Sequence, residues 1–446
     1  MTALWWIVAC TAPIPVPQPI DTGGAPQGEP VVAMRGDVPR NLLMISIDTL
    51  RRDHLQRYAV RGAGHMPWLS AWLSEAVVFD DHQQCSSWTY ASTVCTLSGR
   101  HNADNGFLPK LTNDLREPVP EGQVTLATQL RDAGFSTLLV SPNPWLSEVW
   151  NNAQGYEIAP ELGGGTITAL GSVGLGLLDG VLAEASPPER WFLHLHAVEP
   201  HIPYNPPTEY LKDVPEVPWD MTTQVAHYET TVQWPHLSSA ERAQLEAALR
   251  ARYAAELAYL DDQLATLWDR LLSAGLLEDT LVVLWSDHGE QFWEHDEQSH
   301  AWGLAAEEND AVMAVWAPDL VAPVAWTGPT HATDLVPTVL HALGLPPPAA
   351  TNGYVVGTAP AGRPRFAMVS GRGGTVQAVT SAGWKLEYNW SGTVRMWHRP
   401  TDPEETRDLF VPWMPIAGEL WRLLSRRVAL LEPLETERTP TPPVGL

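Results

Sequence analysis

The segment NLLMISIDTLR, residues 41–51, decides the fold of this 446-residue chain. Its first seven residues form a continuous apolar run, which is typical of a strand buried on both faces of a parallel sheet. The carboxylate of Asp48 follows directly. A second apolar run, 280–285, leads in the same way to Asp287 and His288. Because open α/β sheets bind ligands at the carboxyl ends of their strands, both segments predict a site at one edge of a parallel sheet.

Strand-like and helix-like segments alternate between residues 41 and 350. Further apolar runs that predict strands lie at 77–79, 137–140 and 191–195. Segments with helical spacing lie at 66–76, 91–97, 125–133, 239–274 and 333–343, and a glycine follows each of the last three. This order predicts an α/β domain whose doubly wound, mostly parallel sheet is flanked by helices.

Beyond about residue 360 the pattern changes to short alternating segments, which are typical of antiparallel strands. They lie at 367–370, 376–379, 385–389 and 394–397, and a helical pattern follows at 419–431. Residues 351–446 are therefore predicted to form a small α+β subdomain, and residues 41–350 the catalytic domain.

The composition limits the possible partners. With 44% hydrophobic residues the chain can build a large core. It carries 27 Lys and Arg against 52 Asp and Glu, a net charge of −25, and its only lysines are Lys110, Lys212 and Lys385. Such a surface repels nucleic acid and anionic bilayers. An anionic substrate would therefore need a locally positive site, most simply a bound metal. No apolar run is long enough to cross a membrane as a helix.

The first ten residues, MTALWWIVAC, are apolar and end in small residues before Cys10. This pattern resembles a bacterial lipoprotein cleavage site, although no Lys or Arg precedes the apolar run; the alternative is a plain apolar start. Residues 11–40 are rich in Pro, Gly and Thr, as a flexible tether would be. We expect an exported envelope protein whose contact with the membrane is an acyl anchor on Cys10.

The chemistry is expected where Asp48, Thr89, Asp287 and His288 converge. Two carboxylates, an imidazole and a hydroxyl form a reasonable set of ligands for a divalent metal. Thr89 belongs to the segment SWTYASTVCTLSGR, residues 87–100. A threonine hydroxyl is a poor nucleophile at neutral pH, and direct metal binding would supply it as an alkoxide. The helix predicted just after Thr89 would favour an anion at its N-terminus.

These segments resemble the sulfatase branch of the alkaline phosphatase superfamily. The resemblance extends over most of the chain, through 41–54, 87–100, 197–207, 252–264, 281–295 and 332–346. It implies metal ligands at Asp48, Asp287 and His288 and a nucleophile at Thr89. It also implies contacts of His201 and His300 with the transferred group. Leu97, Ser98, Gly99 and Arg100 fix the register, which places Thr89 where sulfatases carry the Cys or Ser that is oxidised to formylglycine.

The departures from the family pattern shift the expected chemistry. Threonine cannot become formylglycine, and family members with Thr at this place resemble phosphoryl transferases and phosphodiesterases. Thr49 replaces a second Asp, Ala91 a Pro and Thr93 an Arg, and Asn105-Gly106 stands for His-Gly. Because an imidazole joins few carboxylates, we expect one divalent metal, with Mn²⁺ or Zn²⁺ favoured over Ca²⁺ or Mg²⁺.

The expected function is a metal-dependent hydrolase or transferase that acts on phosphoric or sulfuric esters through Thr89, with His201 or His300 assisting the leaving group. An envelope glycan or a lipid head group would be a suitable substrate. One alternative is a conventional sulfatase. The other is a non-catalytic envelope binding protein that keeps the fold. The natural substrate and the oligomeric state are not predicted.

Other residues receive structural interpretations. His194, His196 and His295 are expected to be structural or exposed, and the acidic run Asp402–Glu405 to be a solvated turn that matches a family segment. Glu199 is a further candidate, for a second metal. Cys85 and Cys95 would pair in an exported protein and otherwise be small buried apolar side chains, and the second outcome is slightly favoured.

Overall fold

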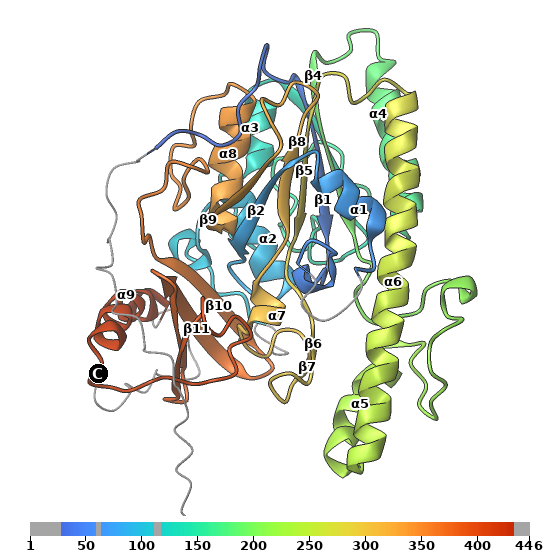
Figure 1. Cartoon of the computed structure of the whole chain (residues 1–446). Helices are drawn as coiled ribbons and strands as arrows, with labels where there is room; N and C mark the ends of the chain where they lie inside the picture. The colour runs from blue at the N-terminus through green and yellow to red at the C-terminus, as the bar shows by residue number, and fades with distance from the viewer. Residues whose placement is uncertain (1–27, 59–63, 111–116, 432–446) are drawn as a thin grey trace, which may run out of the picture.

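The computed structural model describes residues 28–58, 64–110 and 117–431. Cys10, the predicted signal segment and most of the predicted tether lie outside these residues. The predicted fold class is confirmed: a mostly parallel sheet lies between helices, and a small antiparallel sheet follows toward the C-terminus (Figure 1).

The central sheet has seven strands in the order β3-β4-β1-β5-β8-β2-β9. Strand β1 pairs in parallel with β4 and β5, β3 with β4, and β9 with β2, whereas β8 is antiparallel to β5 and β2. The strands are β1 Asn41–Ile47, β2 Val77–Gln83, β3 Phe135–Val140, β4 Arg190–Ala197, β5 Thr280–Ser286, β8 Met313–Trp316 and β9 Val324–His331. The apolar run that opened the chain is thus a central strand with parallel neighbours on both sides.

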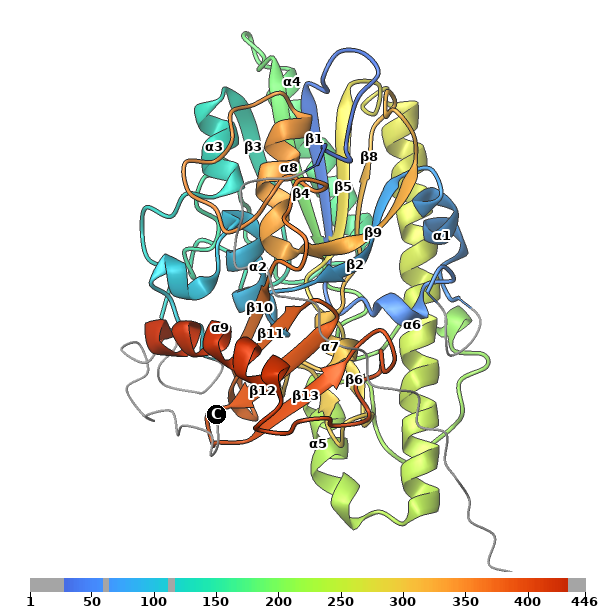
Figure 2. The same ribbon diagram turned by 60° about the vertical axis from the view of Figure 1, so that its left-hand side comes forward.

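Helices cover both faces of this sheet, as Figures 1 and 2 show. Alternate residues of β1 explain the arrangement: Leu43, Ile45 and Ile47 pack toward α1, α4 and α6, and Leu42 and Met44 toward α3 and α8. The helices are α1 Pro67–Leu73, α2 Thr89–Ser98, α3 Leu126–Asp132, α4 Ile167–Leu182, α6 Ser239–Ser273 and α8 Leu335–Ala342. Burial on both faces is the reason that β1 reads as an unbroken apolar run.

The C-terminal part forms a four-stranded antiparallel sheet in the order β10-β11-β12-β13, with α9 packed on it (Figure 2). Its elements are β10 Arg365–Gly371, β11 Gly374–Ser381, β12 Trp384–Asn389, β13 Val394–His398 and α9 Pro415–Leu431. Four shorter elements lie near the second sheet or project from the domain: α5 Gln224–Gln233, β6 Gln291–Phe292, β7 Gln298–Ser299 and α7 Ala306–Asn309. Single 3₁₀ turns span Arg52–His54, Asn102–Asn105, Thr208–Tyr210, Trp234–His236 and Ala332–Asp334.

Two structural expectations are wrong. Cys85 and Cys95 form a disulfide, because Cys85 precedes the turn into α2 and Cys95 lies within that helix, which brings the two Cα atoms to 6.3 Å. Glu405 is not solvated: it is 3% exposed and pairs with Lys385 at 2.6 Å and Arg399 at 3.0 Å.

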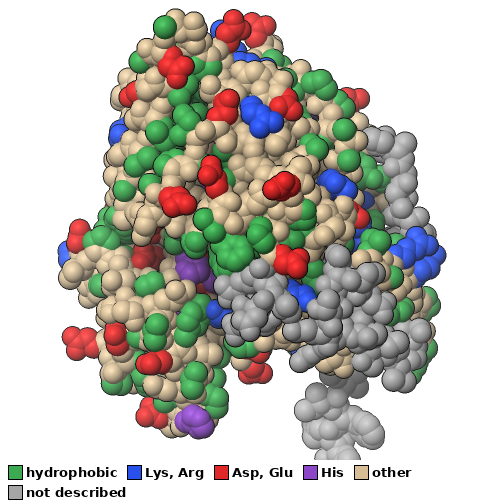
Figure 3. Space-filling view, turned by 180° about the vertical axis from the view of Figure 1, so that it is seen from behind, with side chains coloured by type: hydrophobic (Ala, Val, Ile, Leu, Met, Phe, Trp, Pro, Cys, Tyr) green, Lys and Arg blue, Asp and Glu red, His purple; other side chains and the backbone are tan. Residues whose placement is uncertain are grey.

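The surface matches the acidic composition, since carboxylate side chains are spread over the face shown in Figure 3. Within the described residues, no helix is both long enough and apolar enough to span a membrane.

Candidate active site

Asp48 and Asp287 lie side by side at the carboxyl ends of β1 and β5. The pairing of Ile47 with Ser286 fixes this arrangement. One carboxylate oxygen of each residue is held by a protein donor. Asn143 Nδ2 donates to Asp48 Oδ2 at 2.8 Å, and the backbone N–H of His288 donates to Asp287 Oδ1 at 2.8 Å. The other oxygens, Asp48 Oδ1 and Asp287 Oδ2, are buried without a hydrogen-bond partner in the structure.

His288 completes this group. Its Nδ1 lies 2.9 Å from the carbonyl oxygen of Gly289, and a carbonyl can only accept, so Nδ1 carries the proton and Nε2 presents a lone pair. Nε2 lies 3.6 Å from Asp48 Oδ1 and 3.7 Å from Asp287 Oδ2. Burial lowers the pKa of His288, so the ring is neutral at pH 7. Three acceptor atoms therefore lie close together, an arrangement that fits a divalent cation.

The ionisation of the two carboxylates also indicates a site for a cation. Burial, and after it the negative charge of Asp48, raises the pKa of Asp287 well above its usual range. Burial also opposes ionisation of Asp48, but His201, His196 and His288 outweigh this effect and lower the pKa of Asp48 to about 2. Two buried acids of which only one ionises readily form a site that a cation would stabilise.

Thr89 is the first residue of α2, and its hydroxyl lies 3.2 Å from His288 Nε2. No side chain caps this helix, so the start of α2 keeps its capacity to bind an anion. Ser92 fixes the helix to β5, because its hydroxyl donates to the carbonyl oxygen of Asp287 at 2.5 Å. Thr93, at the motif position of the family arginine, turns into the helix and donates to the carbonyl oxygen of Thr89 at 2.7 Å.

His201 and His300 lie beside this centre. The His300 ring is 4.5 Å from the His288 ring and 5.1 Å from the His201 ring. His201 Nδ1 donates to the carbonyl oxygen of Ile202 at 2.6 Å, which directs its Nε2 away from that bond. Burial lowers the pKa of both rings, so both are neutral at pH 7. All six residues predicted for the site are thus brought to one end of the sheet.

Three residues of this neighbourhood were not predicted. Asn143, which follows β3, orients Asp48. Glu290 Oε1 lies 3.1 Å from His300 Nδ1. His196 was interpreted as structural or exposed; it is fully buried, and its Nε2 has no hydrogen-bond partner and lies 3.8 Å from Asp48 Oδ2. Its spacing from His194 on a strand beside β1 was the available signal, since alternate residues of a strand share a face.

The remaining sequence candidates lie elsewhere. Glu199 belongs to neither of the groups of potential metal ligands found in the described residues. The second group joins Cys85 with His101 and His331, and Cys85 is already in a disulfide. His295 contacts Glu307 at 3.0 Å.

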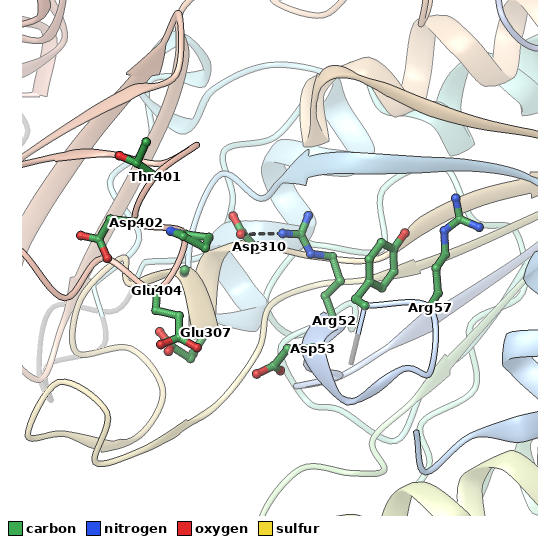
Figure 4. Close-up of a pocket in the computed structure, with 11 residues that line it drawn as sticks. Arg52, Asp53, Arg57, Glu307, Asp310, Thr401, Asp402 and Glu404 are labelled. Carbon is green, nitrogen blue, oxygen red and sulfur yellow. Dashed lines mark hydrogen bonds and ion pairs between the residues drawn. The ribbon is translucent and has the colours of Figure 1, made fainter. Parts of the chain in front are cut away.

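A cavity of about 710 Å³ lies away from the predicted residues, between the 52–58 segment, α7 and the 401–404 turn (Figure 4). Both arginines that line it are already paired: Arg52 with Asp310 at 2.8 Å, and Arg57 with Asp80 at 2.8 Å. Asp310 also pairs with Arg399 at 2.5 Å. These contacts hold the C-terminal sheet against the main domain, and we assign the cavity no chemistry.

Solved structures with the same fold define the class of this protein. A protein solved in complex with its substrate D-glucosamine-2-N,6-O-disulfate superposes with a TM-score of 0.71 over 90% of this chain and 99% of that chain, at 15% identity. The phosphonate monoester hydrolase of Silicibacter pomeroyi superposes with a TM-score of 0.66 over 89% of this chain and 96% of that chain, at 19% identity. These likenesses show that the chain shares the fold of both proteins.

The family is shown by the sequence. Residues 40–345 match the family model described as Sulfatase, and the chain belongs to the sulfatase family. Arylsulfatase K of Bos taurus is 30% identical over 106 residues, which are 24% of this chain and 19% of the bovine protein. The alignment thus spans about a fifth of that relative. The predicted family is confirmed, and sulfatase-family enzymes are metal-dependent hydrolases.

Proposed function

We propose that this chain is a metal-dependent enzyme that cleaves or transfers phosphoric or sulfuric esters, with Thr89 Oγ1 as the nucleophile. The observation that carries the proposal is the position of this hydroxyl, 3.2 Å from His288 Nε2, beside the unpaired oxygens of Asp48 and Asp287. Phosphoryl transfer is favoured over sulfate hydrolysis, because threonine cannot be converted to formylglycine.

Asp48, Asp287, His288 and Thr89 would hold one divalent ion. When bound, such an ion lowers the pKa of a coordinated hydroxyl and neutralises charge on the ester. A single imidazole among two carboxylates favours Mn²⁺ or Zn²⁺ over Ca²⁺ or Mg²⁺. Asn143 supports the set by holding Asp48 in one orientation.

The protein side chains divide the remaining work. Thr89 Oγ1 forms a bond to phosphorus or sulfur while the bond to the leaving oxygen breaks. The uncapped N-terminus of α2 stabilises the negative charge that develops there. His201 or His300 assists the leaving group: its neutral ring takes up the proton that the Thr89 hydroxyl releases and passes it to the leaving oxygen. Water or another acceptor then releases the covalent threonine ester.

The substrate and the location of the protein follow from the same proposal. One structural neighbour binds a sulfated glucosamine, and another is a 2-O glycosaminoglycan sulfatase. These neighbours favour an anionic ester of an envelope glycan, with a lipid head group as the alternative. We also propose export and an acyl anchor at Cys10. A Cys10→Ser variant that stays in the membrane fraction would contradict the anchor.

The test compares the purified protein with Thr89→Ala on aryl sulfate, phosphate monoester and phosphodiester substrates, after the bound metal has been measured. We expect turnover of a phosphate ester that falls by at least roughly 10³-fold in the variant, as on removal of a nucleophile. Turnover that survives Thr89→Ala contradicts the nucleophile. Thr89-dependent turnover of aryl sulfate alone favours a conventional sulfatase. A metal-free protein inert to all three favours the non-catalytic alternative.

A further inference from the structure

The turn between β10 and β11 brings one arginine to the edge of the active site. Its sequence is Gly371-Arg372-Gly373-Gly374, so Arg372 is its single side chain. The backbone N–H of Arg372 donates to the carbonyl oxygen of Ala301 at 2.9 Å. Ala301 directly follows His300, and its own N–H donates to the carbonyl oxygen of Ser87 at 3.1 Å, two residues before Thr89. Two backbone hydrogen bonds therefore connect this turn to the nucleophile segment.

The glycines make this approach possible. A Cβ atom on Gly371 would lie 2.0 Å from the carbonyl oxygen of Ala301, and one on Gly373 would lie 2.5 Å from that of Trp302. Both distances are far below any allowed contact, so a side chain at either position would push the turn away from the segment that carries His300. The turn is thus built to lie close to the site with an arginine at its tip.

The guanidinium is held by aromatic rings rather than by a carboxylate. Its central carbon lies 4.3 Å from the Tyr228 ring of α5 and 5.9 Å from the Trp302 ring. Nη2 donates to the Tyr228 hydroxyl, which is the only side-chain hydrogen bond of Arg372 within the described part of the chain. Gln298 contacts His227 and Thr231, which fixes α5 beside β7. The orientation of the arginine is therefore set by three separate segments.

This positive charge is unpaired in a strongly acidic protein. Within the described ranges no carboxylate forms an ion pair with Arg372, whose side-chain hydrogen bond goes to Tyr228, although the chain has 52 acidic and 27 basic residues. The backbone hydrogen bond of Arg372 to Ala301 places this charge beside the segment that carries His300. An arginine has five N–H donors, and most of these remain available to a ligand.

We propose that Arg372 is a substrate-binding residue, whose guanidinium binds an anionic oxygen of the phosphate or sulfate ester. Arginine is suited to this role, because its planar group binds tetrahedral oxyanions through charge-assisted hydrogen bonds. The proposal rests on the proposed function of the same site. Arg372 would supply the local positive charge that a protein of net charge −25 needs to bind an anionic substrate.

The test measures binding and turnover separately in Arg372→Ala and Arg372→Gln. Arg372→Gln keeps the stem and a hydrogen-bonding head but removes the charge. Arg422→Ala is the matched control, because Arg422 is exposed on α9 and its loss changes the net charge equally. We expect inorganic phosphate, measured by calorimetry on the metal-loaded protein, to bind roughly 10- to 100-fold more weakly to both Arg372 variants, the range for one hydrogen bond to a charged group. KM for the substrate should rise by a similar factor, with a smaller change in kcat.

Unchanged phosphate affinity in a folded Arg372→Gln protein, or equal weakening in Arg422→Ala, would overturn the proposal. Thermal unfolding shows whether each variant is folded, and Arg372→Gln replaces Arg372→Ala if the alanine variant is not. Failure of the proposed function can be distinguished from failure of the Arg372 proposal. Turnover that survives Thr89→Ala contradicts the proposed function, whereas phosphate calorimetry still tests Arg372. Loss of turnover in Thr89→Ala together with normal phosphate binding in Arg372→Gln contradicts the substrate-binding role of Arg372 and leaves the proposed function intact.

Discussion

Replacement of Asp287 by asparagine is expected to stabilise the metal-free protein and to remove its stabilisation by metal. Asp287 Oδ1 already accepts two backbone N–H groups, from Thr49 and His288, whereas Oδ2 is buried without a partner. In the variant, the amide nitrogen would take the place of Oδ2 and could donate to the unpaired Oδ1 of Asp48. At a pH where both acids of the wild type are ionised, a like-charge contact thus becomes a hydrogen bond.

The magnitude follows from the geometry. The candidate ligand atoms of Asp48, Asp287 and His288 lie within 4.8 Å of one another. Two unit charges at this distance repel by about 3 kcal/mol at an effective dielectric constant of about 20. Because the folded protein raises the pKa of Asp287, the contribution of Asp287 to the stability of metal-free wild type is greatest below the unfolded value of 3.8 and falls as the pH rises. The advantage of the variant should therefore grow with pH.

The assay is chemical unfolding of both proteins after chelation and again with Mn²⁺ or Zn²⁺. Wild type should gain about 2.7 kcal/mol at a metal concentration of about 100 times Kd. The variant should gain much less, because it has lost one charged ligand. Asp179→Asn, an exposed residue of α4, is the control for net charge. A chelated Asp287→Asn protein less stable than wild type, or equally stabilised by metal, would refute the site.

Three further predictions concern stability. Replacing both Cys85 and Cys95 by alanine should lower the free energy of unfolding by about 3 kcal/mol, the chain-entropy value for a loop of about ten residues; an unchanged denaturation midpoint contradicts this. Glu294→Gln should cost about 3 kcal/mol at pH 7: although burial opposes its ionisation, Arg51 lowers the pKa of Glu294 to about 2, so its stabilisation is present above pH 4.5 and lost as the pH falls to about 2. A pH-independent difference between the two proteins would exclude this explanation. Arg363→Ala should cost about 3–5 kcal/mol, because it leaves a buried carboxylate unpaired; urea unfolding with a loss below about 1 kcal/mol would show that the pair is weak.

The central strands were predictable because their signal is local. The bounds of β1 agree with its apolar run, and β5 extends only one residue further than expected. The edge strand β9 was missed, since VAWTGPTH contains Gly328 and Pro329 and half of it is exposed. Strand β8 has four residues, too few for a pattern. Helix α5 was missed because it buries only His227 and Thr230, which leaves no apolar stripe.

Site residues that directly follow a strand were predictable from the sequence. Site residues that only the tertiary fold brings to the site were not. Asp48 and Asp287 follow β1 and β5, so strand order alone brings them together. The family register placed Thr89. Asn143 lies in an irregular segment after β3, and only the tertiary fold turns its amide toward Asp48. His196 carried a local signal, its alternation with His194, but nothing in the sequence shows which face of β4 meets Asp48.

Thr93 illustrates why a lost motif residue does not settle activity. Thr93 replaces an arginine of the family pattern, and the replacement removes a cation from the nucleophile motif. In the structure, the buried Thr93 hydroxyl donates to the carbonyl oxygen of Thr89 and accepts from the side-chain amide of Asn152. The positive charge stands instead on Arg372, which the glycines of a distant hairpin bring beside the segment of His300. A cation at this site can therefore come from a part of the chain that no motif covers, and the substitution at position 93 loses its weight as evidence for inactivity.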